Sequence, residues 1–144
     1  GVVPRMEQLT VDLPQISMAL SLHAPTQELR AEIVPAARGW KMDRLMAALD
    51  EHVKVTGRAA LIQYILLAGL NDTEAMGEVL AKLLHGRRVK LNLIPYNPVQ
   101  SLSTIVQMLA VFLWLPFETV DVHCTVCGVE FRRRDYGIPR TNQG

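Results

Sequence analysis

Two stretches of the sequence place side chains that can bind a polar ligand at the ends of apolar runs. Ser21 and His23 end the alternating run that begins at Ile16, within "SLHAPTQELRAEIVP". Asn97 follows a second apolar run at residues 89–94, within "KLNLIPYNPVQ". Hydroxyl, imidazole and amide groups bind the amines, carboxylates and ribose hydroxyls of small ligands. Because Ser21 and His23 are two residues apart, an extended chain directs both to the same face.

The histidines and cysteines form no strong metal-binding or nucleophilic pattern. The sequence has 4 histidines and 2 cysteines, and Cys124 and Cys127 form a single C-x-x-C beside His123. Zinc sites in proteins are four-coordinate, so a zinc-stabilised protein that uses these three residues is only a third, weaker hypothesis. The sequence contains no G-x-S-x-G, P-loop or G-x-G-x-x-G motif, which leaves the common hydrolase, NTPase and dinucleotide-binding classes without support.

Length and composition are those of one globular domain. The 144 residues are 49% hydrophobic and 20% charged, which is enough apolar content to bury a core. The net charge of +1 gives no general argument for a nucleic-acid partner, and the only strong basic run is at residues 132–134. The densest apolar segment, residues 105–117, is shorter than the ~20 residues of a bilayer-spanning helix. We therefore expect no membrane partner.

Apolar periodicity predicts helices that alternate with buried strands over the first hundred residues. Stripes at helical spacing follow Pro4, Thr26, Lys41 and Asn71, and continuous or alternating apolar runs lie between them. The predicted strands are residues 16–22, 59–67 and 89–94. Strands that alternate with helices indicate a parallel sheet with helical crossovers, either part of a β/α barrel or an open α/β sheet. After residue 100 a helix at 102–115, short strands at 119–126 and 129–131, and an irregular tail are expected.

The carboxyl ends of these strands form the predicted ligand site, because ligands bind at this edge of parallel α/β sheets. His23 has an alternative interpretation as a hydrogen-bonded structural residue, and Asn71 and Asp72 have one as a helix cap. The residues that follow the three strands, in order, are Ser21, Leu22 and His23; Gly69, Asn71 and Asp72; and Pro95, Tyr96 and Asn97.

Four ordered segments resemble one enzyme family. "GVVPRMEQL", "ALSLHAPTQELRAEIVP", "IQYILLAGLNDT" and "VKLNLIPYNPV" are similar in order and spacing to the radical S-adenosylmethionine (SAM) RNA methyltransferases of the RlmN/Cfr group. The resemblance covers roughly residues 1–100. It implies a transferase that methylates carbon 2 of an adenine in 23S ribosomal RNA and in some transfer RNAs. It also implies SAM and a four-iron–four-sulfur cluster as cofactors, and a flavodoxin-like reductant.

The resemblance implies a fold and a cofactor site. The fold is α/β, a partial (β/α) barrel of the radical SAM type with parallel strands and helical crossovers. Residues 1–100 would form this barrel part, and residues 101–144 a divergent C-terminal segment. Ser21, Leu22, His23 and Asn97 match the family positions that contact SAM. No catalytic residue and no metal ligand carries over.

Two features of the family pattern are missing from this chain. The cluster-binding motif C-x-x-x-C-x-x-C would precede Gly1, and the methyl-carrying cysteine near the C-terminus has no counterpart after the arginine run. Gln63 also replaces the glutamate expected in most relatives. We therefore expect the chain by itself to be inactive. It is interpreted as a fragment of a methyltransferase, with a catalytically inert paralogue that binds nucleosides or RNA as the alternative. The expected location is the cytoplasm, or an organelle if the source is a plant.

Overall fold

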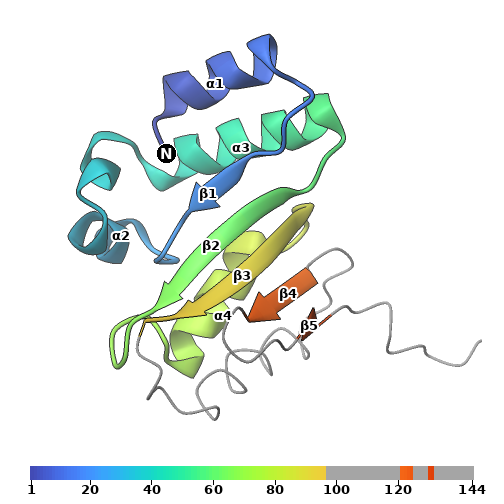
Figure 1. The fold of residues 1–144 in the computed structure, drawn as a ribbon. Helices are drawn as coiled ribbons and strands as arrows, with labels where there is room; N and C mark the ends of the chain where they lie inside the picture. The colour runs from blue at the N-terminus through green and yellow to red at the C-terminus, as the bar shows by residue number, and fades with distance from the viewer. Residues whose placement is uncertain (97–120, 125–129, 132–144) are drawn as a thin grey trace, which may run out of the picture.

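The structure is a computed structural model that describes residues 1–96, 121–124 and 130–131. In these residues five strands form one sheet in the order β1-β2-β3-β4-β5 (Figure 1). The first four strands are parallel, and the last is antiparallel to its neighbour. The predicted parallel sheet with helical crossovers is confirmed. The strands are β1 (Ala19–Ser21), β2 (Ala60–Leu66), β3 (Val89–Pro95), β4 (Asp121–Cys124) and β5 (Glu130–Phe131).

Three of the described helices begin or end at a residue suited to capping. The Oγ1 of Thr26 accepts a hydrogen bond from the N–H of Leu29 at 3.3 Å, and the Oγ1 of Thr73 accepts one from the N–H of Met76 at 3.3 Å. Gly57 follows the longest of the described helices with a φ of 67°, a left-handed conformation that glycine adopts without a steric penalty. The helices are α1 (Val3–Asp12), α2 (Gln27–Ile33), α3 (Met42–Thr56) and α4 (Glu74–Leu84), with a short 3-10 helix, η1 (Pro35–Gly39), between α2 and α3.

The sheet has two different faces because alternate residues of a strand point to opposite sides. One set of side chains in β2 and β3 is buried, and the set between them is only partly buried or exposed. In Figure 1, α4 lies behind β2 and β3, and the opposite face of these strands is turned toward the viewer. The buried face joins α1, α3 and α4 in one core, whose members include Met6, Leu20, Leu45, Leu49, Ile62, Tyr64, Leu80, Leu84, Leu91 and Leu93.

Two sequence-based expectations about element boundaries were wrong. The first strand begins at Ala19 rather than at Ile16, which is 38% exposed. Asn71 does not cap α4; Thr73 does, because the side chain of Asn71 is occupied at the strand ends. The expected strands at 119–126 and 129–131 correspond to β4 and β5. The expected helix at 102–115 and the irregular tail lie outside the described residues, and among the described helices none could cross a membrane.

Candidate functional site

The turn after β1 has a backbone conformation that is unusual for its sequence. The N–H of Leu22 donates to the carbonyl of Gln63 at 3.0 Å, so the pairing of β1 with β2 continues one residue beyond the strand. The next residue, His23, has a φ of 60°, the only positive value at a described non-glycine residue. Left-handed backbone is uncommon outside glycine and gathers at functional sites. The chain therefore leaves the sheet sharply, and His23 stays beside the end of β2.

The imidazole of His23 is fixed in one tautomer by the neighbouring strand. Its Nδ1 accepts a hydrogen bond from the backbone N–H of Ile65 at 3.2 Å, so in the neutral ring the proton lies on Nε2. Burial lowers the pKa of His23 below its usual 6.5, and the positive charges of Arg30 and the chain's amino group lower it further. At neutral pH the ring is uncharged and holds one N–H, on Nε2, that the strand does not use.

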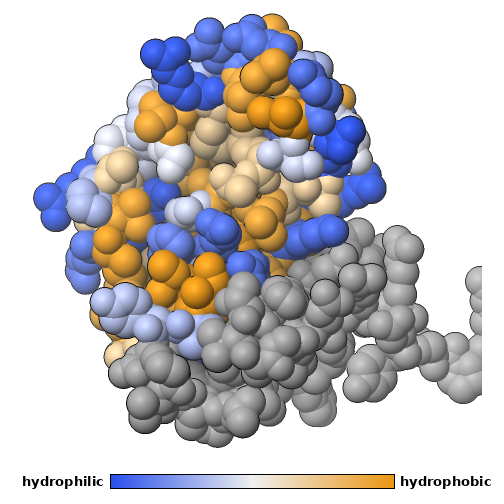
Figure 2. Space-filling view, viewed as in Figure 1, coloured by the Kyte–Doolittle hydropathy of each residue, from blue (hydrophilic) through white to orange (hydrophobic). Residues whose placement is uncertain are grey.

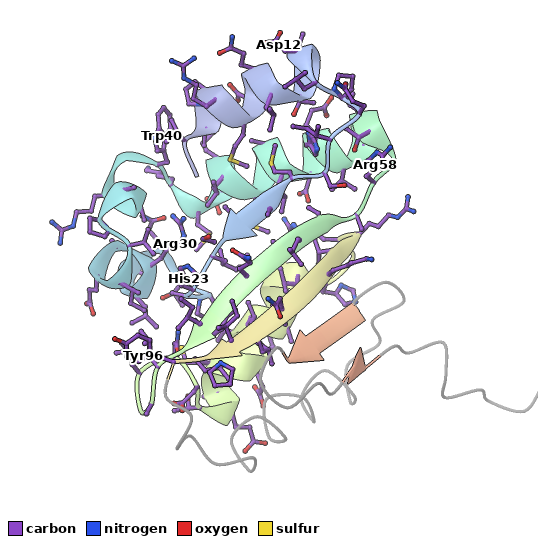
Figure 3. The ribbon with its side chains drawn as sticks, in the orientation of Figure 1. Asp12, His23, Arg30, Trp40, Arg58 and Tyr96 are labelled. Atoms are coloured by element: carbon purple, nitrogen blue, oxygen red, sulfur yellow. The ribbon has the colours of Figure 1, made fainter. Side chains whose placement is uncertain are left out.

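Arg30 holds the carbonyl groups that precede His23. Its Nε donates to the carbonyl of Leu22 at 3.2 Å and its Nη2 to that of Ser21 at 3.4 Å. The residue is 0% exposed, and burial lowers the pKa of its guanidinium. The remaining nitrogen, Nη1, is buried without a hydrogen-bond partner. Figure 3 shows Arg30 and His23 close together beside the end of β1.

Asn71 connects the carboxyl ends of β1 and β2. Its Nδ2 donates to the carbonyls of His23 and Ile65, both at 2.7 Å, and its Oδ1 accepts from the N–H of Leu67 at 2.6 Å. The backbone carbonyl of Asn71 accepts from the hydroxyl of Tyr64 at 2.9 Å. All of the side-chain groups of this fully buried residue are thus used within the protein. Asn71 is a structural residue that positions His23, and it is not free to bind a ligand.

Asp72 shapes the loop after β2. Its Oδ1 accepts a hydrogen bond from the N–H of Gly69 at 2.7 Å, and Gly69 has a φ of 70° that favours glycine. Together with burial, the charge of Asp72 raises the pKa of Tyr64, so that hydroxyl remains a donor. Asp72 therefore helps to hold the loop that follows β2.

The site residues predicted from the sequence differ in their exposure and in whether the structure describes them. Ser21 is exposed, and its Oγ donates to the Oε1 of Gln63 at 3.3 Å; His23 lies next to it with the Nε2 proton available. Leu22 is 0% exposed; its N–H donates to the carbonyl of Gln63 and its carbonyl accepts from Arg30, so it shapes this turn from inside the protein. Tyr96 is 75% exposed at the end of β3. Asn97 lies outside the described residues.

Sequence reasoning missed Arg30 and the polar residues inside the strands. Arg30 belongs to a seven-residue helix, α2, whose polar sequence suggests an exposed face. In the sequence Gln63 and Asn92 interrupt runs of apolar residues, and this interruption is a signal that could have identified them as site residues. The described residues contain no group of three or more His, Cys, Asp or Glu that could hold a metal ion. Cys127 lies outside them, so the zinc hypothesis gains no support.

Comparisons with known proteins agree on one family. No family model matches the chain. It is 41% identical over 103 residues to a probable dual-specificity RNA methyltransferase RlmN of Nostoc punctiforme, 46% identical over 99 residues to that of Symbiobacterium thermophilum, and 44% identical over 103 residues to that of Frankia alni. These alignments cover 72%, 69% and 72% of the chain.

The solved structures give the same result for the fold. A radical SAM methyltransferase from Sphaerobacter thermophilus superimposes with a TM-score of 0.77 at 34% sequence identity, over 86% of this chain and 38% of that protein. The chain spans only 28%, 27% and 25% of the three RlmN relatives. The predicted radical SAM type of α/β fold is therefore confirmed for the part of the fold that the chain contains. The chain belongs to the RlmN-type family of radical SAM methyltransferases.

Proposed function

We propose that this chain supplies part of the SAM-binding barrel of an RNA methyltransferase that modifies carbon 2 of an adenine in 23S ribosomal RNA and in some transfer RNAs. The supporting observation is the turn after β1, where Ser21, Leu22 and His23 lie at the carboxyl end of the sheet with His23 held by Ile65. A strained turn that directs polar groups to this edge suits a ligand site. The expected location remains the cytoplasm, or an organelle in a plant.

The polar groups at this turn fit SAM, which carries a carboxylate, an ammonium group, ribose hydroxyls and an adenine. The Nε2–H of His23 can donate to a ribose or carboxylate oxygen, and the exposed hydroxyl of Ser21 can donate or accept. The side chain of Asn97 completes the proposed contacts, and Leu22, whose backbone groups are held by Gln63 and Arg30, fixes the turn that presents Ser21 and His23. When bound, SAM supplies the methyl group and, after reductive cleavage, the radical chemistry.

The residues of this chain do not fit the four-iron–four-sulfur cluster. Such a cluster is held by cysteine thiolates, and the chain has only 2 cysteines, one at the end of β4 and one outside the described residues. We infer that the chain alone neither assembles the cluster nor methylates RNA, and that both need cysteines from elsewhere together with a flavodoxin-like reductant. The boundary between a barrel part at 1–100 and a divergent segment at 101–144 is part of the same proposal.

The alternative is a catalytically inert paralogue that binds nucleosides or RNA. It shares the site at Ser21 and His23 with the first proposal and differs from it only in the chemistry. Sequencing the source transcript beyond both ends of this chain separates the two. An in-frame C-x-x-x-C-x-x-C before Gly1 supports the methyltransferase, and stop codons on both sides support the binding module.

Activity is tested by expressing the 144-residue chain in a bacterium that lacks its own RlmN-type enzyme. Mass spectrometry of nucleosides from 23S ribosomal RNA is expected to show no 2-methyladenosine. Anaerobic reconstitution with iron and sulfide is expected to leave no stable cluster on the purified chain. A stable cluster, or methylated RNA, would overturn the conclusion that the chain cannot act alone.

A further inference from the structure

A row of neutral polar side chains crosses the sheet on the face opposite α4. Ser21 in β1 is the register partner of Gln63 in β2, and Gln63 is the partner of Asn92 in β3. Directly paired residues of neighbouring parallel strands carry their side chains on the same face. The row continues to the register position of His123 in β4. No described side chain in this row, Ser21, Gln63 or Asn92, carries a charge.

Aliphatic side chains border this row on the side of the strand ends. Ile65 and Ile94 are register partners two positions further along β2 and β3, and both are only partly buried. They form a small apolar shelf next to the turn that holds His23, since the N–H of Ile65 donates to that imidazole. Figure 2 shows hydrophobic and hydrophilic side chains next to one another on this face. A ligand bound on this face would contact the apolar side chains of Ile65 and Ile94 beside the side-chain amides of Gln63 and Asn92.

One hydrogen-bond acceptor in the row is buried and unused. The Oδ1 of Asn92 has no partner, whereas the Oε1 of Gln63 accepts from the Oγ of Ser21 at 3.3 Å. A buried unsatisfied amide oxygen is costly, and most such atoms in native proteins have a partner. Because the described part of the row is neutral, a charged ligand would have no counter-ion there. The missing partner is therefore a neutral donor, an N–H or an O–H.

We propose that Gln63 and Asn92 recognise the polar edge of an adenine base whose ring lies on Ile65 and Ile94. Side-chain amides of Asn and Gln pair with adenine because each presents an acceptor and a donor to its amino group and ring nitrogen. The exocyclic 6-amino group supplies the N–H that the Oδ1 of Asn92 lacks. A base without that group leaves the acceptor unsatisfied, so the row discriminates between purines.

This inference rests on the proposed function, because that function provides two sources of adenine, SAM and the RNA. The first test uses the full chain and two matched nucleosides, adenosine and purine riboside, which differ only in the 6-amino group. Saturation-transfer NMR measures both dissociation constants. We expect adenosine to bind about tenfold more tightly, which is the cost of one unsatisfied buried acceptor.

Two variants test whether the polar row of Gln63 and Asn92 causes the preference for adenosine over purine riboside. In Asn92→Ala the preference for adenosine should fall to about onefold, and in Gln8→Ala, which removes an exposed amide from α1, it should stay as in the unaltered chain. If Asn92→Ala does not fold, as judged by circular dichroism, Asn92→Ser is used in its place, and its hydroxyl should retain only part of the preference. Equal binding of the two nucleosides by the unaltered chain, undetectable binding of adenosine, or an unchanged preference in the Asn92 variant contradicts the proposal.

Two further titrations identify the source of the base. If SAM displaces adenosine and its own affinity depends on Asn92, the recognised adenine is that of SAM. If a single-stranded RNA with one unpaired adenosine binds in the presence of SAM, and this depends on Asn92, the recognised adenine belongs to the RNA. A third outcome contradicts this inference alone and still supports the proposed function. In that outcome SAM binding is lost in His23→Ala but not in Asn92→Ala, and the Asn92 variant keeps the preference for adenosine.

Discussion

The Nδ1 of His23 accepts a hydrogen bond from the backbone N–H of Ile65 at 3.2 Å, across the boundary between β1 and β2. The two residues are 42 positions apart in the sequence, so the tautomer of the ring is set by the tertiary fold. This contact leaves the Nε2–H of His23 as a donor at the carboxyl edge of the sheet. Arg30 and Asn71 hold the backbone on either side of the contact.

The charge state of His23 gives the first prediction. Because burial and the charge of Arg30 lower its pKa, an NMR titration should show a midpoint below 6.5, the value of an unperturbed histidine. The unfolded chain takes up a proton at a higher pH than the folded chain, so the free energy of unfolding should fall as the pH drops below 6.5 and level off below the lowered pKa. Arg30→Met should raise the midpoint. A midpoint above 6.5 in the unaltered chain would contradict the lowered pKa of this ring.

Removal of the Asn71 side chain should cost more stability than removal of the helix cap. Asn71→Ala loses the three hydrogen bonds of a fully buried side chain and should lower the free energy of unfolding by about 3 kcal/mol. Thr73→Ala loses one capping contact and should cost about 1 kcal/mol. Urea denaturation of both variants measures the difference, and a larger effect for Thr73→Ala would show that Asn71 is the less important residue.

The buried hydroxyl of Tyr64 gives a matched pair of variants. Tyr64→Phe removes the donor to the carbonyl of Asn71 and should destabilise the chain by about 1 kcal/mol. Tyr96→Phe is the control, since Tyr96 is 75% exposed, and it should change the stability by less than about 0.5 kcal/mol. The two midpoints are compared by thermal denaturation. Equal midpoints would mean that the Tyr64 hydroxyl contributes nothing to the loop.

The open edge of the sheet predicts self-association of the isolated chain. β1 stands at one end of the strand order, with a partner strand on one side only among the described residues. Unpaired strand edges attract other strands, so size-exclusion chromatography at micromolar concentration should show aggregates. A cooperative, monomeric thermal transition at that concentration would contradict this prediction.

Much of the fold could be predicted from local patterns, and the contacts that shape the site could not. The apolar runs at residues 59–67 and 89–94 predicted β2 and β3 nearly complete, because a strand in a covered parallel sheet is a short run of mostly apolar residues. Thr26, which precedes one of the stripes at helical spacing, caps α2. Asn71 and Thr73 are both good capping residues, and the choice between them depends on strand ends that lie distant in sequence.

The burial of Arg30 was also beyond local patterns. A single arginine in a short polar helix suggests an exposed side chain, and only the carbonyls of Ser21 and Leu22 give it a buried place. The row of Gln63 and Asn92 needed the register of two strands. Each residue alone was visible in the sequence as a polar interruption, but their alignment on one face was not.

The most direct test of the proposed SAM site is an NMR titration of the chain with SAM that follows each histidine separately. We predict that the signals of His23 shift with increasing SAM and that those of the exposed His85, at the other end of the sheet, do not. His23→Ala should weaken binding, whereas His85→Ala should leave it unchanged. Unchanged His23 signals up to the solubility limit of SAM, or equal affinities in the two variants, would contradict the site.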